Sequence, residues 1–244
     1  MRPVRKNASP INGDFNKYED AKPELVSRLG QYCSYCERMV PTLLAVEHIE
    51  PKDGDYKQPH LERRWSNFLL ACTNCNSSKG SKKVDFKELL FPDRDNTFYA
   101  FSYNDDGTVS PSLALNVNQK KLAENTLKLV GLDKPIQEHL DSNGEFVYLD
   151  RVGQRMGAIS EAQEALKCFL SAPSQEMKNM IVSLAKAKGF FSIWMKVFHA
   201  HPDMKILFVR GFNGTELSGC FDMTTAGEIV PSPNHDLLQD GSKI

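Results

Sequence analysis

The apolar positions of the first third of the chain fall into short runs separated by polar segments. Two of these runs, Leu43 to Val46 and Phe68 to Ala71, predict a pair of short strands. The polar segment Thr73 to Lys79 follows the second run and predicts the start of a helix. Ahead of both runs, Asp20 to Leu29 has a proline near its start and a glycine after its end, which is typical of a short helix.

After about residue 95 the pattern changes to helical periodicity. One helix is expected over Leu122 to Val130, a second carries Met156, Ile159, Leu166 and Leu170 on one face, and a third begins at Met180 and continues to His199. Smaller elements are expected as well: a short helix over Phe86 to Leu90, a hairpin from Thr97 through the turn at Gly107, and a strand over Lys205 to Arg210. The predicted fold class is α+β, with one domain over residues 1–95 and a mainly helical domain over residues 96–244.

The net charge of the chain and its apolar runs indicate whether it can bind nucleic acid or a membrane. The chain has 244 residues, a net charge of −1 and a pI near 6.6, so its overall charge attracts a polyanion only weakly. The stretch from Arg63 to Lys83 has five basic residues and no acidic one, which is enough to contact a few phosphates. The basic start of the chain is not followed by an apolar segment, and no run reaches a membrane-spanning length, so we expect no membrane partner. We expect a cytoplasmic protein, because its paired cysteines would be at risk as free thiolates outside a reducing compartment.

Four cysteines form two C-x-x-C pairs, Cys33 with Cys36 and Cys72 with Cys75. Two such pairs are typical of a tetrahedral zinc site, although buried thiols or disulfides are the alternatives. A Cys₄ site is structural because it leaves no ligand position for a substrate. Any catalytic residues must therefore lie outside the cysteines. Cys168 and Cys220 stand alone in apolar contexts, and we expect both to be buried.

The residues around these cysteines carry a recognisable motif. It runs Glu47-His48-Ile49-x-Pro51, then Asn67 five residues before Cys72, and finally Cys75-Asn76 followed by Lys79-Gly80. In this order and spacing the segment resembles the zinc-containing HNH endonuclease family, in which a ββα-metal fold carries the catalytic residues. The family commonly has Asp at the position of Glu47, so the carboxylate here stands on a longer side chain.

The resemblance implies a role for each residue. His48 would act as the general base toward water, because imidazole titrates near neutral pH. Glu47 and Asn76 offer hard oxygen ligands for a catalytic Mg²⁺ or another divalent cation, and Asn67 would hold the strands in register and orient His48. Phosphate contacts are expected from the basic residues Lys79, Lys82 and Arg64.

Size and layout narrow the resemblance to the PtuB family, the HNH subunits of Septu-type and retron-associated anti-phage systems. That resemblance implies a nuclease effector that acts with an ABC-type ATPase similar to PtuA, docked through the helical region. The substrate would be nucleic acid, with DNA favoured and structured RNA such as tRNA as the alternative. The competing hypothesis is a non-catalytic zinc module that binds nucleic acid or scaffolds a complex; such a module has no need for the Glu47, His48, Asn67 and Asn76 set.

Overall fold

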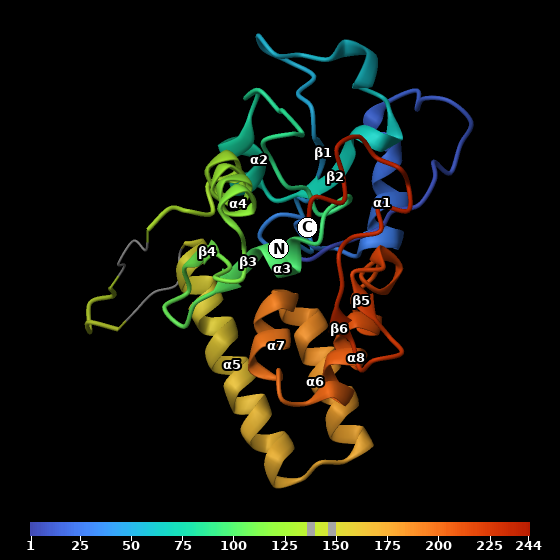
Figure 1. Cartoon of the computed structure of the whole chain (residues 1–244). Coiled ribbons are helices and arrows are strands. Elements are labelled where there is room, and N and C mark those ends of the chain that lie inside the picture. The colour runs from blue at the N-terminus through green and yellow to red at the C-terminus, as the bar shows by residue number, and fades with distance from the viewer. Residues whose placement is uncertain (136–139, 146–149) are drawn as a thin grey trace.

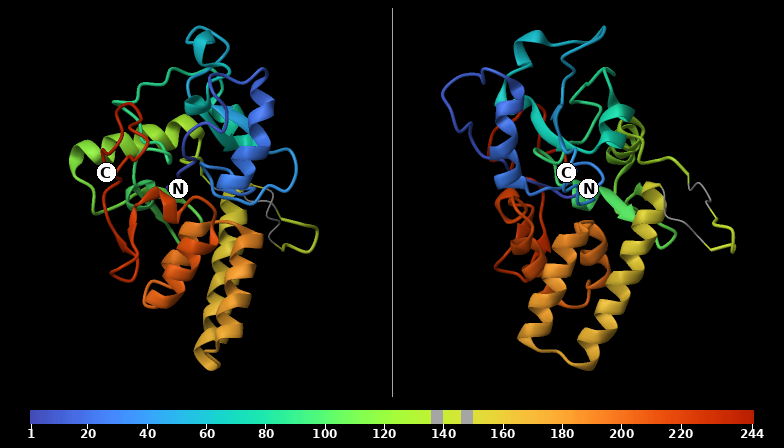
Figure 2. Two further views of the ribbon diagram at one scale, coloured as in Figure 1. Left: turned by 90° about the vertical axis from the view of Figure 1, so that its right-hand side faces the viewer. Right: turned by 180° about the vertical axis from the view of Figure 1, so that it is seen from behind.

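The computed structural model describes residues 1–135, 140–145 and 150–244. Two strands and a short helix, β1, β2 and α2, form a compact unit at one end of the molecule, and the helices α5 and α6 extend away at the other (Figure 1). Both termini lie between these two regions in all three views (Figures 1 and 2). The architecture is mixed α and β, with a mostly helical second half, which confirms the predicted fold class.

The ββα unit is built from adjacent pieces of sequence. Strand β1 (Ala45–His48) pairs antiparallel with β2 (Phe68–Ala71), which places Glu47 opposite Leu69 and His48 opposite Phe68. All four residues of β2 are buried, as expected for a strand covered on both faces. Helix α2 (Thr73–Lys79) follows directly, as predicted, and ends at Gly80 in a positive-φ conformation. Strand β1 starts two residues later than predicted, because the backbone of Leu43 has a φ of +58°, a left-handed conformation that is not found in strands.

Two elements precede and cover this unit. The single-turn helix η1 (Tyr18–Ala21) leads into α1 (Lys22–Leu29), which has a proline in its first turn and Gly30 at its C-cap, as the sequence indicates. The loop between β1 and β2 contains two further single turns, η2 (Pro59–Leu61) and η3 (Trp65–Asn67).

The second half begins with a small hairpin and continues as helices. Asn116 caps α4 with a capping box, Asp150 caps α5, and Ser174 caps α6; in each case the side chain accepts a hydrogen bond from a backbone N–H of the first turn. The elements are α3 (Thr97–Ala100), β3 (Phe101–Tyr103), β4 (Val109–Pro111), α4 (Val117–Val130), α5 (Arg151–Ser171), α6 (Gln175–Lys188), α7 (Phe191–Val197), α8 (Pro202–Gly211), η4 (Glu216–Ser218), β5 (Phe221–Asp222) and β6 (Glu228–Ile229).

Several local predictions were wrong. Lys205 to Arg210 lies within helix α8 rather than in a strand, because Pro202 starts a helix whose buried residues Met204 and Phe208 are four positions apart. The helix predicted from Met180 to His199 is broken at Gly189 (φ +79°) into α6 and α7.

Two further corrections concern loops and single residues. Phe86 to Leu90 is not helical, although Phe86, Leu89 and Leu90 are buried. The hairpin is confirmed, but it starts at Phe101 because Thr97–Ala100 is a helical turn. Cys168 and Leu170 are exposed on α5, whereas Cys220 is buried as expected.

Buried polar contacts join the ββα unit to the helical part. The carboxylate of Glu37, which is 1% exposed, accepts hydrogen bonds from the backbone N–H of Ser192 at 2.8 Å, from its hydroxyl at 2.6 Å and from the hydroxyl of Tyr103 at 3.1 Å. The C-terminal segment returns to the same region, where the backbone N–H of Lys243 donates to Asp95 at 3.1 Å. One cluster of buried apolar residues spans both parts. The division at residue 95 stays a prediction.

Candidate active site

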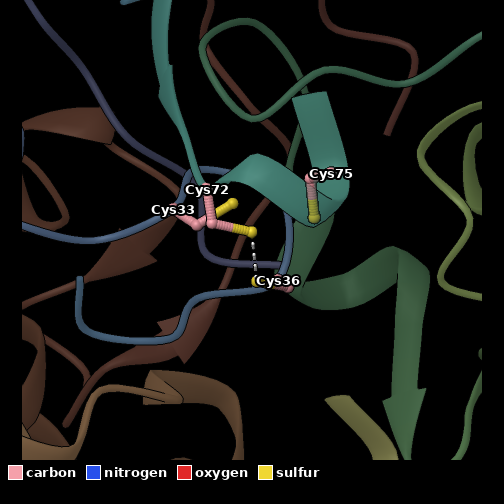
Figure 3. Close-up of side chains that lie close together, drawn as sticks. All are labelled: Cys33, Cys36, Cys72 and Cys75. Carbon is pink, nitrogen blue, oxygen red and sulfur yellow. Dashed lines mark hydrogen bonds between the residues drawn. The ribbon is translucent and has the colours of Figure 1, made fainter. Parts of the chain in front are cut away.

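The four paired cysteines meet in a single buried cluster. Their sulfur atoms all lie within 4.8 Å of one another, and the Sγ atoms of Cys36 and Cys72 are 3.7 Å apart (Figure 3). In a tetrahedron with Zn–S bonds of about 2.3 Å, neighbouring sulfurs are about 3.8 Å apart. The donor set and its spacing are therefore compatible with a zinc ion held by four thiolates.

Local structure explains how the two pairs converge. Cys72 is the N-cap residue of α2 and Cys75 lies in its first turn, so both thiols project from the same end of the helix. The first pair sits on a tight turn, in which the N–H of Glu37 donates to the carbonyl of Cys33 at 2.9 Å. That turn is attached to β2, because the N–H of Ser34 donates to the carbonyl of Leu70 at 2.8 Å.

The four cysteines differ in acidity: burial raises the pKa of Cys33, and hydrogen bonds from the other three cysteines raise the pKa of Cys75. Hydrogen bonds from Cys33 and Cys36 hold the pKa of Cys72 well below its ordinary value. Arg151, from helix α5, donates a hydrogen bond from Nη1 to the sulfur of Cys75 at 3.2 Å. A Cys₄ zinc centre carries a net charge of −2, and this guanidinium offsets part of it.

Glu47 faces a buried cation. Its carboxylate is 1% exposed, and Lys79 at the end of α2 places Nζ 3.0 Å from Oε1. The same ammonium donates to the backbone carbonyl of His48 at 2.7 Å, which ties the last turn of α2 to β1. Burial raises the pKa of Glu47, while the positive charge of Lys79 opposes that shift.

His48 is held in an orientation suited to a base. Its Nε2 lies 2.8 Å from the backbone carbonyl of Glu62, and because a carbonyl only accepts, Nε2 carries the proton. The imidazole packs edge-on against Tyr18 and Phe68, with ring centroids 4.8 and 5.3 Å away. Burial lowers the pKa of His48 below its ordinary value of 6.5. The imidazole is therefore neutral at pH 7, with Nδ1 as its basic nitrogen.

Asn67 fixes the loop that supplies the carbonyl of Glu62. Its side-chain oxygen accepts from the N–H of Glu50 at 2.8 Å, and its Nδ2 donates to the carbonyls of Glu50 at 3.0 Å and Leu61 at 3.3 Å. These bonds tie Asn67, at the end of the loop, to Glu50 at its start and to Leu61, which is the residue before Glu62. Asn67 thus acts on His48 through the loop and does not line the cavity itself.

A surface cavity of about 580 Å³ gathers the chemical groups of the motif. Glu47 and His48 from β1 line it together with Asn76 and Lys79 from α2. Asn76 is one turn before Lys79 and half-buried, so its amide is open to the cavity. A carboxylate, a neutral imidazole and an amide oxygen thus share one cavity. Glu47 and Asn76 could hold a divalent cation there, since both are hard oxygen ligands.

The three residues expected to contact phosphate lie in different places. Lys79 lines the cavity, but it is 2% exposed and paired with Glu47. Lys82 is exposed outside the cavity, where Nζ is 3.5 Å from the carbonyl of Leu129. Arg64 is also outside the cavity and pairs with Asp14 at 2.5 Å. Their role in substrate binding stays a prediction.

Three residues at the cavity had no assigned role in the sequence. Tyr18 and Lys22, from η1 and the start of α1, line its rim, and Lys52 places its ammonium 4.0 Å from the centre of the Tyr18 ring. Lys52 follows the motif proline directly, which is the one signal that pointed to it. Tyr18 and Lys22 lie well before Glu47 in the sequence, and tertiary packing brings them to the cavity.

Comparison with known proteins agrees with this geometry. Residues 32–82 match the family model for the HNH endonuclease, so the chain contains an HNH endonuclease domain, and this domain holds the four-cysteine cluster and the paired strands β1 and β2. Among curated proteins, the chain is similar to the retron Vc95 putative HNH endonuclease of Vibrio cholerae serotype O1 biovar El Tor, with 33% identity over 110 residues. The aligned stretch covers 43% of this chain and 54% of that protein, so the chain spans about half the length of the relative it matches.

Within the described residues, no helix combines the length and the apolar character needed to cross a membrane.

The cysteine cluster predicts a structural metal. We expect purified protein to contain about one zinc ion per chain, and Cys72→Ser to lose that zinc and melt at least about 10 °C lower, because metal binding and folding of such sites are coupled. Elemental analysis and thermal unfolding measure both quantities. The control is Cys168→Ser, the same change at an exposed cysteine outside the cluster, which should alter neither. Wild-type zinc content in Cys72→Ser would contradict the assignment.

Proposed function

We propose that this protein is a divalent-cation-dependent endonuclease that hydrolyses phosphodiester bonds in nucleic acid. The observation that carries the proposal is the meeting of Glu47, a neutral His48 and Asn76 in one cavity within an HNH domain. The Cys₄ cluster supports the fold of this site, and zinc is its proposed ion.

Each residue has a chemical task in this proposal. His48 takes a proton from the attacking water at Nδ1, since Nε2 is already bonded to the carbonyl of Glu62. Glu47 and Asn76 hold the cation. A bound cation supplies stabilisation of the charge on the phosphate and on the leaving 3′ oxygen. Because water is the nucleophile, no 2′-hydroxyl is required, and the products carry 5′-phosphate and 3′-hydroxyl ends.

The substrate proposal favours DNA, with structured RNA as the alternative. A direct test offers plasmid DNA, single-stranded DNA and total tRNA to the protein in Mg²⁺ or in EDTA. The competing function, a non-catalytic zinc module, has less support. A zinc module needs the cysteines, but it gives no reason for an oriented neutral histidine beside a carboxylate in a cavity. Absence of cleavage of every substrate, with and without a partner, would favour the zinc module.

The first functional prediction concerns His48. His48→Ala should lower the cleavage rate at least about 10²-fold, because it removes the general base. Cleavage is measured under single-turnover conditions, and zinc content and the melting temperature establish that the variant is folded. His60→Ala is the matched control, since His60 is exposed in the following loop and does not line the cavity. Equal rates for His48→Ala and wild type would refute the assignment.

The second functional prediction concerns pH. Catalysis needs the neutral form of His48, and burial lowers the pKa of that histidine below 6.5. His48 is therefore protonated only at lower pH. On the acid side of the pH profile, kcat/KM should fall to half its plateau value below pH 6.5. The profile is measured at saturating Mg²⁺ from pH 5 to 9. A midpoint at or above pH 6.5 would mean that His48 is not the titrating base.

We also propose that the protein is the effector subunit of an ATPase-associated anti-phage defence complex in the cytoplasm. The name of the Vibrio cholerae relative links it to a retron, which supports a defence role. The near-neutral net charge supports dependence on a partner, since long-range attraction to nucleic acid is weak. The hairpin formed by α5 and α6 is the proposed docking element. It extends away from the cavity and carries exposed apolar side chains, among them Leu170 and Met180 (Figure 1).

This docking proposal predicts a defined mutational pattern. Leu170→Glu and Met180→Glu should weaken association with an ABC-type ATPase partner by at least about tenfold, as expected when an interface residue worth about 1.4 kcal/mol is lost. Leu113→Glu is the control, because Leu113 is fully exposed but lies outside the hairpin. Binding is measured by calorimetry with purified ATPase. Equal weakening by all three variants, or by none, would contradict docking through the hairpin.

A further inference from the structure

Among the residues that the structure describes, the contacts to the carboxylate of Glu47 all reach one oxygen, Oε1. Lys79 places Nζ 3.0 Å from Oε1, and the hydroxyl of Tyr35 donates to the same Oε1 at 3.4 Å. Both donors are buried, with Lys79 at 2% and Tyr35 at 0% exposure. Lys79 is itself fixed, because its ammonium also donates to the carbonyl of His48 at 2.7 Å. The carboxylate therefore has little freedom to rotate.

The second oxygen of Glu47 is in a different situation. Within the part of the chain that the structure describes, no hydrogen bond to Oε2 is formed, and Glu47 lines the cavity that Asn76 also lines. A cation in this cavity would meet one oxygen of Glu47 that is available and one that is already occupied by two donors. The carboxylate is thereby restricted to a single ligand oxygen.

Divalent cations differ in how they use carboxylates. Mg²⁺ is small, demands near-ideal octahedral geometry and keeps several waters, whereas Ca²⁺ accepts six to eight oxygens and readily takes both oxygens of one carboxylate. We propose that Lys79 and Tyr35 are positioning residues that restrict Glu47 to one ligand oxygen and thereby make the site selective for Mg²⁺ over Ca²⁺. This inference rests on the proposed function, in which Glu47 is a cation ligand.

Two simpler roles for Lys79 make different predictions. If Lys79 only neutralises a buried charge, its removal strengthens or weakens binding of both cations alike, since both carry the same charge. If it only joins β1 to α2, its removal lowers stability without changing the preference between cations. Neither of these two roles changes the ratio of the dissociation constants, Kd(Mg²⁺)/Kd(Ca²⁺). A change in this ratio therefore reports the number of oxygens through which Glu47 binds the cation.

The test measures this ratio by calorimetry in zinc-loaded wild type, Lys79→Met and Tyr35→Phe. Lys79→Met frees Oε1 for bidentate binding, so the ratio should rise at least about tenfold, because selectivity between these ions follows ligand number and flexibility. Tyr35→Phe removes one donor to Oε1 without changing any charge, and the ratio should rise by a smaller factor. The control Lys82→Met removes an exposed lysine outside the cavity and should leave the ratio unchanged.

Glu47→Gln separates failure of this inference from failure of the proposed function. If Glu47→Gln binds both cations as wild type does, Glu47 is not a ligand and the proposed function is wrong. If it weakens both cations while Lys79→Met and Tyr35→Phe keep the wild-type ratio, the cation site stands and the positioning role is overturned. Circular dichroism monitors folding. If Lys79→Met unfolds, Tyr35→Phe decides: a raised ratio supports the inference and an unchanged ratio overturns it.

Discussion

The meeting of the two cysteine pairs is the contact on which the rest of the site depends. Cys36 and Cys72 are separated by 36 positions, and bringing their sulfurs to 3.7 Å closes a loop that contains both β1 and β2. Closing such a loop costs conformational entropy, which a shared metal is suited to offset. Because Cys72 and Cys75 begin α2, the cluster also sets the direction of that helix. That direction carries Asn76 and Lys79 to the cavity.

Buried charges then specify how the elements fit together. Glu47 is paired with Lys79, Glu37 is paired with the ammonium of Met1 and accepts a hydrogen bond from Ser192, and Arg151 is bonded to the sulfur of Cys75. An unpaired buried charge costs several kcal/mol, so each pair tolerates only one arrangement of the two elements that supply it. The contact of Glu37 with Ser192 and the contact of Arg151 with Cys75 reach from the two cysteine pairs into the helical part. The helices therefore support the site through these buried contacts.

The charges that line the cavity are compatible with the proposed nuclease, which would bind nucleic acid with the help of a partner. Lys22 and Lys52 face the cavity, but Glu19 and Asp53 line it too, and the charge of Lys79 is taken up by Glu47. The cavity is therefore close to neutral without a cation. A bound cation would make it positive, so that cation binding and attraction of a phosphate are coupled.

The sequence by itself determined the chemistry of the site and the short elements that carry it. The two C-x-x-C pairs, the Glu47-His48 dipeptide and the positions of Asn67 and Asn76 identified the HNH domain, and the start of α2 was predicted at Thr73, because all of these are local patterns. Tertiary structure alone decided the rest. The buried pair between Lys79 and Glu47, the tautomer of His48 and the approach of Tyr18 to the cavity arise between residues that are not neighbours in the chain. The apolar run in α8 shows the same limit, because a short run fits a strand and a buried helix equally well until its neighbours are known.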